Sequence, residues 1–196
     1  MMSPRRPVSS PTVAFRRLRD PNLVTRNLPM PISELLLPEW DAEIATTRRV
    51  LERVPDARAE WKPHPKSFCM AHLAQLVARM PGWATMMMRL PEIDIAPKDG
   101  PTRGYSIETV ESLLAEFDRN AAEGRAAIAA TSDAEFGEPW TLKAGGVAVQ
   151  TNSRYQMLRT SMLNHLVHHR AQLGVYLRLV DEPVPSMYGP TADERF

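Results

Sequence analysis

Helical periodicity is the feature that most limits how this 196-residue chain can fold. Apolar residues recur at intervals of three and four over four long segments, and no strong series of strands accompanies them. The segments cover residues 38–54, 68–90, 107–130 and 154–180. Amphipathic helices in this number bury their apolar faces against one another. The sequence therefore predicts an all-α four-helix bundle.

Prolines and small polar residues set the expected ends of these helices. Pro38 suits an early helical position, and Pro55 ends the first helix. Ser67 and Ser106 are the expected N-caps of the second and third helices. Pro81, which a glycine follows, predicts a kink or a break inside the second helix.

The segment between the third and fourth helices, residues 131–153, has a different pattern. Gly145-Gly146 is a turn signal, and the Val-Ala-Val of residues 147–149 could form a short strand. We expect a long loop or a small hairpin before the last helix. Loops of this length are often functional.

The formal net charge of +1 is unevenly distributed. Residues 1–29 hold six arginines and one aspartate, so the remainder, with 18 basic and 22 acidic residues, is mildly acidic. Its charge argues against a nucleic-acid surface. We expect residues 1–29 to be a disordered tail and residues 30–196 to form the domain. An arginine-rich start also resembles a transit peptide, and this alternative stays open.

Two absences in the sequence bear on location. Cys69 is the only cysteine, so no disulfide can form within the chain, which fits a reducing compartment. The longest apolar run, around residues 83–88, is far shorter than the ~20 residues that a membrane span needs. We therefore expect a cytoplasmic protein with no membrane partner.

Two histidines lie within the apolar stripe of the last helix. His165 and His169 are four residues apart, so they share one face on successive turns. A buried imidazole without a partner costs about 1–3 kcal/mol, and one metal ion can satisfy both rings. On the same helical wheel His168 falls at the edge of the stripe, and Arg170 points away from its centre.

A third ligand is available on the second helix. His72 is central on the apolar face of that helix, whereas His64 lies in a proline-flanked connector that does not fix its place. Cys69 also faces inward, but its favoured role is that of a small apolar filler. The sequence therefore predicts a metal centre formed by His72, His165 and His169.

Three neutral imidazoles favour an open site over a structural one. A structural zinc site usually has four protein ligands, whereas a catalytic site keeps one position for water or substrate. Leu166 stands where metalloproteases of the His-Glu-x-x-His type have their glutamate. The pattern thus favours binding a thiolate or polarising a carbonyl, and hydrolysis would need a base from another segment. Zinc is the first choice of metal, with nickel, iron or copper as alternatives.

Four further residues are weaker candidates for a pocket or for supporting the ligands. Gln172 lies beside the two histidines on the helical wheel, and His168 lies at the edge. Trp83 and Tyr176 are expected core aromatics that could line a pocket. No catalytic residue can be assigned.

The stretch HLVHHRAQLGVYLRL resembles the C-terminal His-x-x-x-His-Arg-Gly-Gln signature of the DinB-like damage-inducible proteins. The segments WKPHPKS, AHLAQLVARMPGW, FDRN, PWTLKAGG and PVPSMYGPTADE extend the resemblance over roughly Ile32 to Glu194. Ala171 departs from it, because the family commonly has glycine there. The departure leaves the predicted ligands unchanged.

The resemblance implies a small metal-binding four-helix bundle with up-down-down-up connectivity and one long crossover. It implies that His72, His165 and His169 are the metal ligands and that the protein forms a homodimer. Its superfamily includes thiol-dependent S-transferases, so a metal-dependent transferase with a low-molecular-weight thiol as cosubstrate is the expected function. The alternative is a non-enzymatic, metal-stabilised dimer of a stress response.

Overall fold

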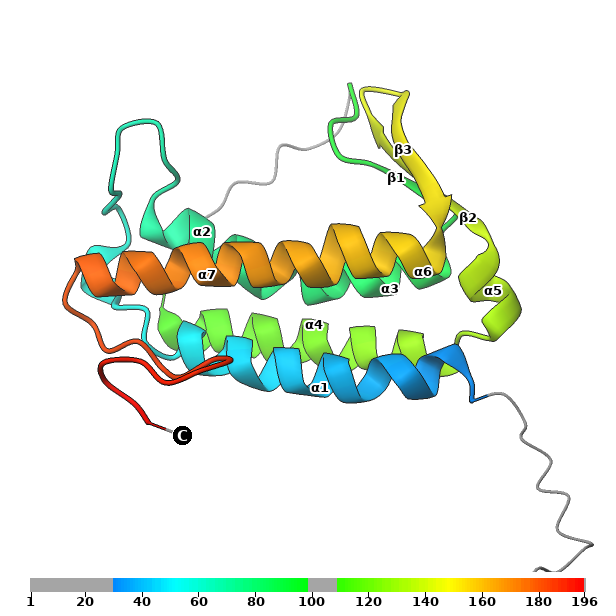
Figure 1. Cartoon of the computed structure of the whole chain (residues 1–196). Helices are drawn as coiled ribbons and strands as arrows, with labels where there is room; N and C mark the ends of the chain where they lie inside the picture. The colour runs from blue at the N-terminus through cyan, green and yellow to red at the C-terminus, as the bar shows by residue number, and fades with distance from the viewer. Residues whose placement is uncertain (1–29, 99–108, 196) are drawn as a thin grey trace, which may run out of the picture.

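The computed structural model describes residues 30–98 and 109–195, so the predicted tail of residues 1–29 lies outside the described residues. Long helices pack into a bundle that carries a small sheet at one end (Figure 1). The larger elements are α1 (Ile32–Leu51), α2 (Met70–Arg79), α3 (Pro81–Arg89), α4 (Val110–Ala130) and α7 (Asn164–Leu179). The shorter ones are η1 (Asp56–Arg58), β1 (Glu92–Asp94), α5 (Asp133–Gly137), β2 (Pro139–Ala144), β3 (Val147–Ser153), α6 (Arg154–Met157) and the π-helical segment η2 (Leu158–Leu163).

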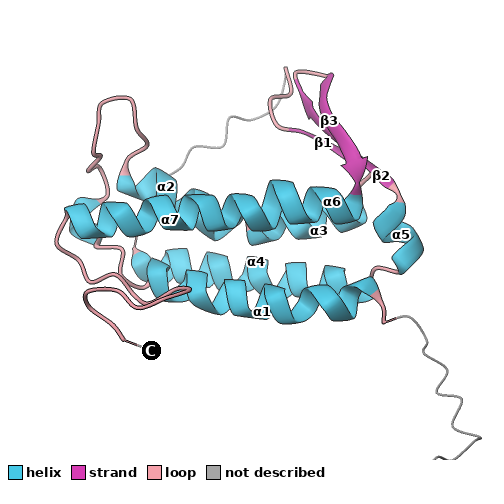
Figure 2. Ribbon diagram, viewed as in Figure 1, coloured by secondary structure: helices cyan, strands magenta, loops and turns pink. Residues whose placement is uncertain are grey.

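The bundle has two layers, as the ribbon of Figure 2 shows. One layer contains α1 and α4, and the other contains α2–α3 beside the continuous helix α6–η2–α7. The chain runs in one direction along α1 and along α6–η2–α7, and in the opposite direction along α2–α3 and α4 (Figure 1). This is the predicted up-down-down-up order, and the long crossover joins α3 to α4.

The first helix begins earlier than predicted. It starts at Ile32, and Pro38 lies inside it. The amides of Glu34 and Leu35 both donate to the carbonyl of Pro31, so the first turn forms upstream of the proline. Pro38 cannot donate an amide hydrogen bond inside α1, but this did not set where the helix begins.

The second helix is interrupted as predicted, because α2 ends at Arg79 and α3 begins at Pro81. The predicted cap was wrong, since Cys69 precedes α2 and makes no side-chain capping bond. The connector supplies the missing acceptors instead. Trp61 and Ala59 accept from the first two amides of α2 through their carbonyls, at 2.8 and 2.9 Å.

Two further expectations concern α4 and the sheet. Thr109 caps α4 through a reciprocal pair of bonds with Ser112, whereas the predicted cap Ser106 lies outside the described residues. The expected hairpin is confirmed: β2 and β3 are antiparallel, and Gly145 and Gly146 turn between them with positive φ. Pairing of β1 in parallel with β2 was not predicted.

Gly124 allows α4 to approach two neighbouring helices. A β-carbon at this position would lie 2.6 Å from Cη2 of Trp40 and 2.7 Å from the carbonyl oxygen of Pro81. The indole is fully buried, and the carbonyl belongs to the backbone, so neither can move cheaply. A helical position that would otherwise favour alanine therefore requires glycine.

The Gly124→Ala variant is expected to lower the free energy of unfolding by about 2 kcal/mol, because overpacking outweighs the ~1 kcal/mol gain in helix propensity. Urea denaturation measures this. Gly174→Ala is the matched control, since its nearest neighbour is the flexible methyl end of Met187 at 3.0 Å. Equal stabilities for the two variants would contradict the packing argument.

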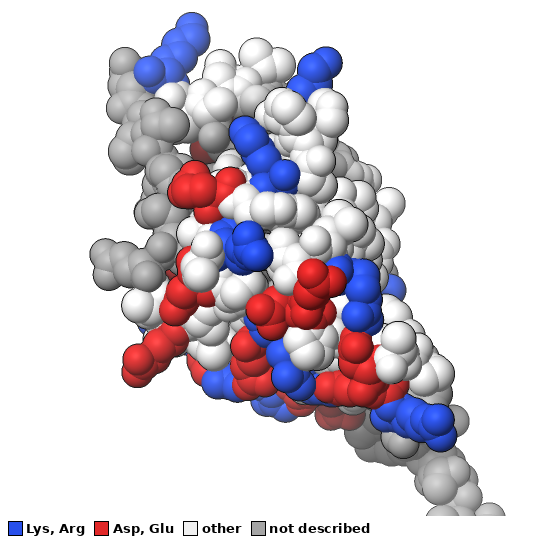
Figure 3. All heavy atoms as spheres, turned by 90° about the vertical axis from the view of Figure 1, so that its left-hand side faces the viewer, with Lys and Arg blue, Asp and Glu red and all other residues white. Residues whose placement is uncertain are grey.

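Acidic and basic side chains are interspersed on the end of the molecule that Figure 3 faces. Arg48 contacts both Asp118 and Glu52. Among the described residues, no helix is both long and apolar enough to cross a bilayer.

Candidate metal centre

A π-helical turn sets which residues of the last long helix face the core. The segment η2, between α6 and α7, fits more residues into each turn than an α-helix does. A helical wheel drawn with a constant 100° step therefore assigns the wrong direction to every side chain after η2. The buried face of α7 is centred on Leu166, Leu173 and Leu177. Arg170 lies within this face and is completely buried, so the prediction that it points away was wrong.

His165 and His169 come together on this helix. Their Nε2 atoms are 2.8 Å apart, and their ring centroids are 4.5 Å apart. His169 is buried, whereas His165 is half-buried at the edge of the face. The predicted pair is therefore brought together.

A hydrogen bond places the proton of the His169 ring. Nδ1 of His169 lies 2.7 Å from the amide oxygen of Gln172, which can only accept, so this nitrogen carries the proton. The Nε2 atom of neutral His169 then carries a lone pair, and it lies within hydrogen-bond distance of Nε2 of His165.

Both rings favour the neutral form. Burial lowers the pKa of His165, and the bond to Ser161 only partly opposes this. Burial likewise lowers the pKa of His169, against the opposing effect of Gln172. Neutral imidazole is the form that binds a metal ion.

His72 lies on α2, near this pair. A charge on His72 lowers the pKa of His169, and burial lowers the pKa of His72 itself. Phe68 stacks on its ring with centroids 4.0 Å apart. Within the described ranges, no three His, Cys, Asp or Glu side chains are already grouped closely enough to hold a metal ion. Ligation by His72 together with the pair stays a prediction.

The weaker candidates lie at different distances from the pair. Gln172 contacts His169 directly, and Trp83 lies beside His165 with ring centroids 5.6 Å apart. His168 is exposed, although its ring centroid is 4.9 Å from that of His169. Their roles in a site remain predictions.

Three other residues lie away from the paired nitrogens. Tyr176 packs against Trp61 in an edge-to-face contact, farther along α7. His64 is exposed in the connector, where its Nδ1 accepts from a backbone amide. Cys69 is half-buried just before α2.

Sequence reasoning missed a buried polar cluster next to the pair. Arg170 forms an ion pair with Glu43 of α1 at 2.7 Å and donates to the hydroxyl of Thr47 at 3.1 Å. The hydroxyl of Tyr188 accepts from Arg170 and donates to Glu43, both at 2.7 Å. Arg170 directly follows His169, so this cluster fixes the turn that carries the histidine pair.

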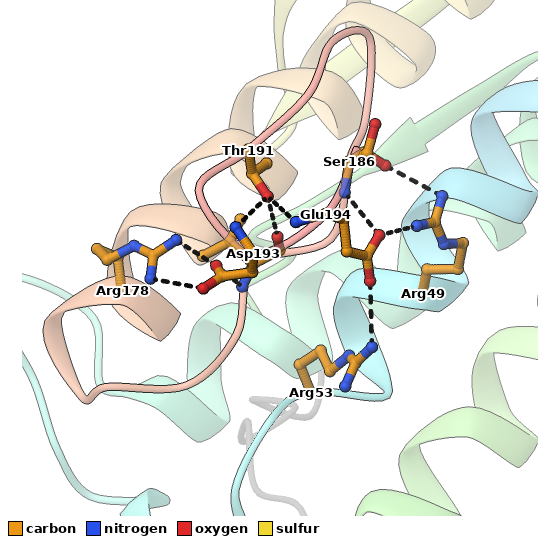
Figure 4. Close-up of polar contacts among 8 residues, drawn as sticks. Arg49, Arg53, Arg178, Ser186, Thr191, Asp193 and Glu194 are labelled. Carbon is orange, nitrogen blue, oxygen red and sulfur yellow. Dashed lines mark hydrogen bonds and ion pairs between the residues drawn. The ribbon is translucent and has the colours of Figure 1, made fainter. Parts of the chain in front are cut away.

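Ion pairs join the C-terminal segment to α1 and α7 (Figure 4). Asp193 pairs with Arg178, and Glu194 pairs with Arg49 and Arg53 of α1. The Asp193 carboxylate also accepts from the amide of Val184, at 2.9 Å. The guanidinium of Arg178 holds the pKa of Asp193 below its usual value. The segment thereby fastens α7 to α1.

The histidine pair suits a cation. The two Nε2 atoms are 2.8 Å apart, close enough to share a proton in a hydrogen bond. A tetrahedral ion with bonds of about 2.0–2.1 Å to nitrogen separates its ligand atoms by about 3.3 Å, so the rings would open by roughly half an ångström. Gln172 would then be the supporting group that orients a ligating ring. Two of the three predicted ligands are therefore placed where they could bind one divalent ion, and binding of a metal stays a prediction.

This chain is similar to one protein family and to several solved structures. The family model of the DinB superfamily matches residues 39–173. A DinB-like protein from Bacillus cereus is 17% identical, with a TM-score of 0.61 over 81% of this chain and 98% of its own. A DinB-like protein from Bacillus subtilis is 13% identical, with a TM-score of 0.59 over 78% of this chain and 96% of its own. No curated protein sequence matches this chain.

Proposed function

Because the chain belongs to the DinB superfamily, we propose that it is a metal-dependent enzyme that transfers the sulfur of a small thiol to an electrophile. His72, His165 and His169 would hold a divalent ion. The observation that carries the proposal is the pair of Nε2 atoms at 2.8 Å, together with the bond between Nδ1 of His169 and Gln172.

A bound divalent ion would lower the pKa of a thiol and keep it as thiolate near neutral pH. The protein's own groups supply orientation. Gln172 fixes the ring of His169. In the transfer, a bond forms between the thiol sulfur and the electrophilic carbon, the leaving group departs with the electron pair of its own bond, and the thiol proton passes to solvent.

Leu166, which stands between the two histidines in place of an acid, favours a thiol over water as nucleophile. Leu166 is fully buried at the position where a hydrolytic site of the His-Glu-x-x-His type has its general base. A thiol ionises far more readily than water and needs no such base. Free thiols persist in a reducing compartment, so we place the reaction in the cytoplasm.

A second candidate is a metal-stabilised homodimer without enzymatic activity that acts in a stress response. It is favoured by the outer face of α7, where Val175 and Leu179 are each more than half exposed. An apolar groove of about 360 Å³ lies beside them. Removal of the metal by a chelator should lower the melting temperature greatly if the ion is structural, and only slightly if it is catalytic.

A thiol-conjugation screen tests the first candidate. The protein is loaded with zinc, nickel, iron or copper and mixed with several low-molecular-weight thiols and an activated halide. Conjugation is expected to exceed the uncatalysed rate by at least about 100-fold for one thiol, because ionisation and orientation together supply that much. No acceleration with any metal and thiol would favour the non-enzymatic homodimer.

A further inference from the structure

Phe68 links the two helices that carry the candidate ligands. Its ring stacks on that of His72 at the start of α2, with centroids 4.0 Å apart and planes 12° from parallel. Its backbone carbonyl accepts a hydrogen bond of 3.2 Å from the hydroxyl of Tyr176 on α7. One residue thus contacts the third predicted ligand and the helix of the other two.

A purely structural role does not account for this contact. An apolar residue before a helix cap commonly packs on an apolar residue of the first turn. Phe68 precedes the cap residue Cys69 in this way, yet its ring lies on a histidine and remains 46% exposed. Burial of apolar area therefore gives little reason for the stack.

The geometry of the stack suits a metal ligand. A nearly parallel ring covers one face of the imidazole, whereas the lone pair of an imidazole nitrogen points along the ring edge. Phe68 thereby restricts the rotation of His72 without blocking its nitrogens. The bond from Tyr176 fixes Phe68 relative to α7, where His165 and His169 lie.

We propose that Phe68 is a positioning residue of the metal centre, which sets the ring plane of His72 relative to the pair on α7. The inference rests on the proposed metal site and adds to it a residue that binds no metal itself. Groups that orient a ligating histidine typically change metal affinity by about 10- to 100-fold.

The test compares zinc affinity and the visible absorption of bound Co²⁺ in full-length variants. Phe68→Ala is expected to weaken zinc binding about tenfold and to alter the Co²⁺ spectrum. Phe68→Tyr, which keeps the ring, should restore both. Tyr176→Phe removes only the hydroxyl and should give a smaller loss in the same direction. Val147→Ala, at an exposed apolar position of β3, is the matched control.

The outcomes separate the inference from the proposal on which it rests. A wild-type protein that binds neither zinc nor Co²⁺ overturns both. Wild-type binding with unchanged affinity and spectrum in Phe68→Ala overturns the positioning role alone, even if that variant melts at a lower temperature. If Phe68→Ala does not fold, an unchanged affinity and spectrum in Tyr176→Phe still overturn it.

Discussion

The His165→Ala variant, purified beside the wild type, is expected to retain less than about a tenth of an equivalent of metal. The substitution removes one of the two Nε2 atoms that face each other at 2.8 Å, so His169 has no partner ring on its own helix. Loss of a direct ligand costs more affinity than the 10- to 100-fold typical of a supporting group. Elemental analysis after buffer exchange measures the bound metal, and His169→Ala should behave alike.

His168→Ala provides the control for these variants. His168 neighbours both rings in sequence, but its side chain is exposed and lies off the paired nitrogens. Its loss should leave one equivalent of metal in place. Stoichiometric metal that survives in both His165→Ala and His169→Ala would show that the ion is bound elsewhere.

The Arg170→Met variant is expected to lose about 3–5 kcal/mol of unfolding free energy. The side chain of Arg170 is 1% exposed and that of its partner Glu43 is 11% exposed. Methionine nearly fills the space but leaves the carboxylate buried without its cation, which is the costly way to break such a pair. Domains are stable by only about 5–15 kcal/mol, so the loss should be evident in urea denaturation.

A double substitution distinguishes a lost charge from lost packing. Replacing both partners, as in Glu43→Leu with Arg170→Met, removes the unpaired charge and should recover most of the stability. The double variant could instead be less stable than Arg170→Met by as much as the Glu43→Leu substitution costs on its own. In that case lost packing, and not an unpaired charge, explains the lower unfolding free energy. An unfolding free energy of Arg170→Met within about 1 kcal/mol of the wild type would contradict the role of the pair.

Local signals in the sequence predicted much of the fold. The break between α2 and α3 follows from Pro81, which lacks an amide donor. The hairpin turn follows from Gly145, which adopts positive φ. Each feature therefore depends on few residues. The pairing of β1 with β2 joins residues about 50 positions apart, and its three residues carry no distinct pattern. The predicted start of the first helix at Pro38 was wrong for a similar reason, because the acceptor that starts α1 is the carbonyl of Pro31.

The candidate site was partly predictable. The spacing of His165 and His169 brings them together in any α-helical continuation, and the structure does so. Arg170 was misplaced because a constant step per residue ignores the wider turn of η2. Its partners Glu43 and Tyr188 belong to distant segments, and no spacing rule links them.

The π-helical segment η2 also bears on how this helix can vary in evolution. A π-helical turn contains one more residue than an α-helical turn. The α-helical segments on either side of it still bury the same faces. A single codon can therefore be lost between Leu158 and Leu163 without turning the histidine pair, whereas loss of one codon elsewhere in the helix would rotate everything beyond it by about 100°. Alignments of relatives should allow a one-residue gap here, or the histidines will be matched to their neighbours.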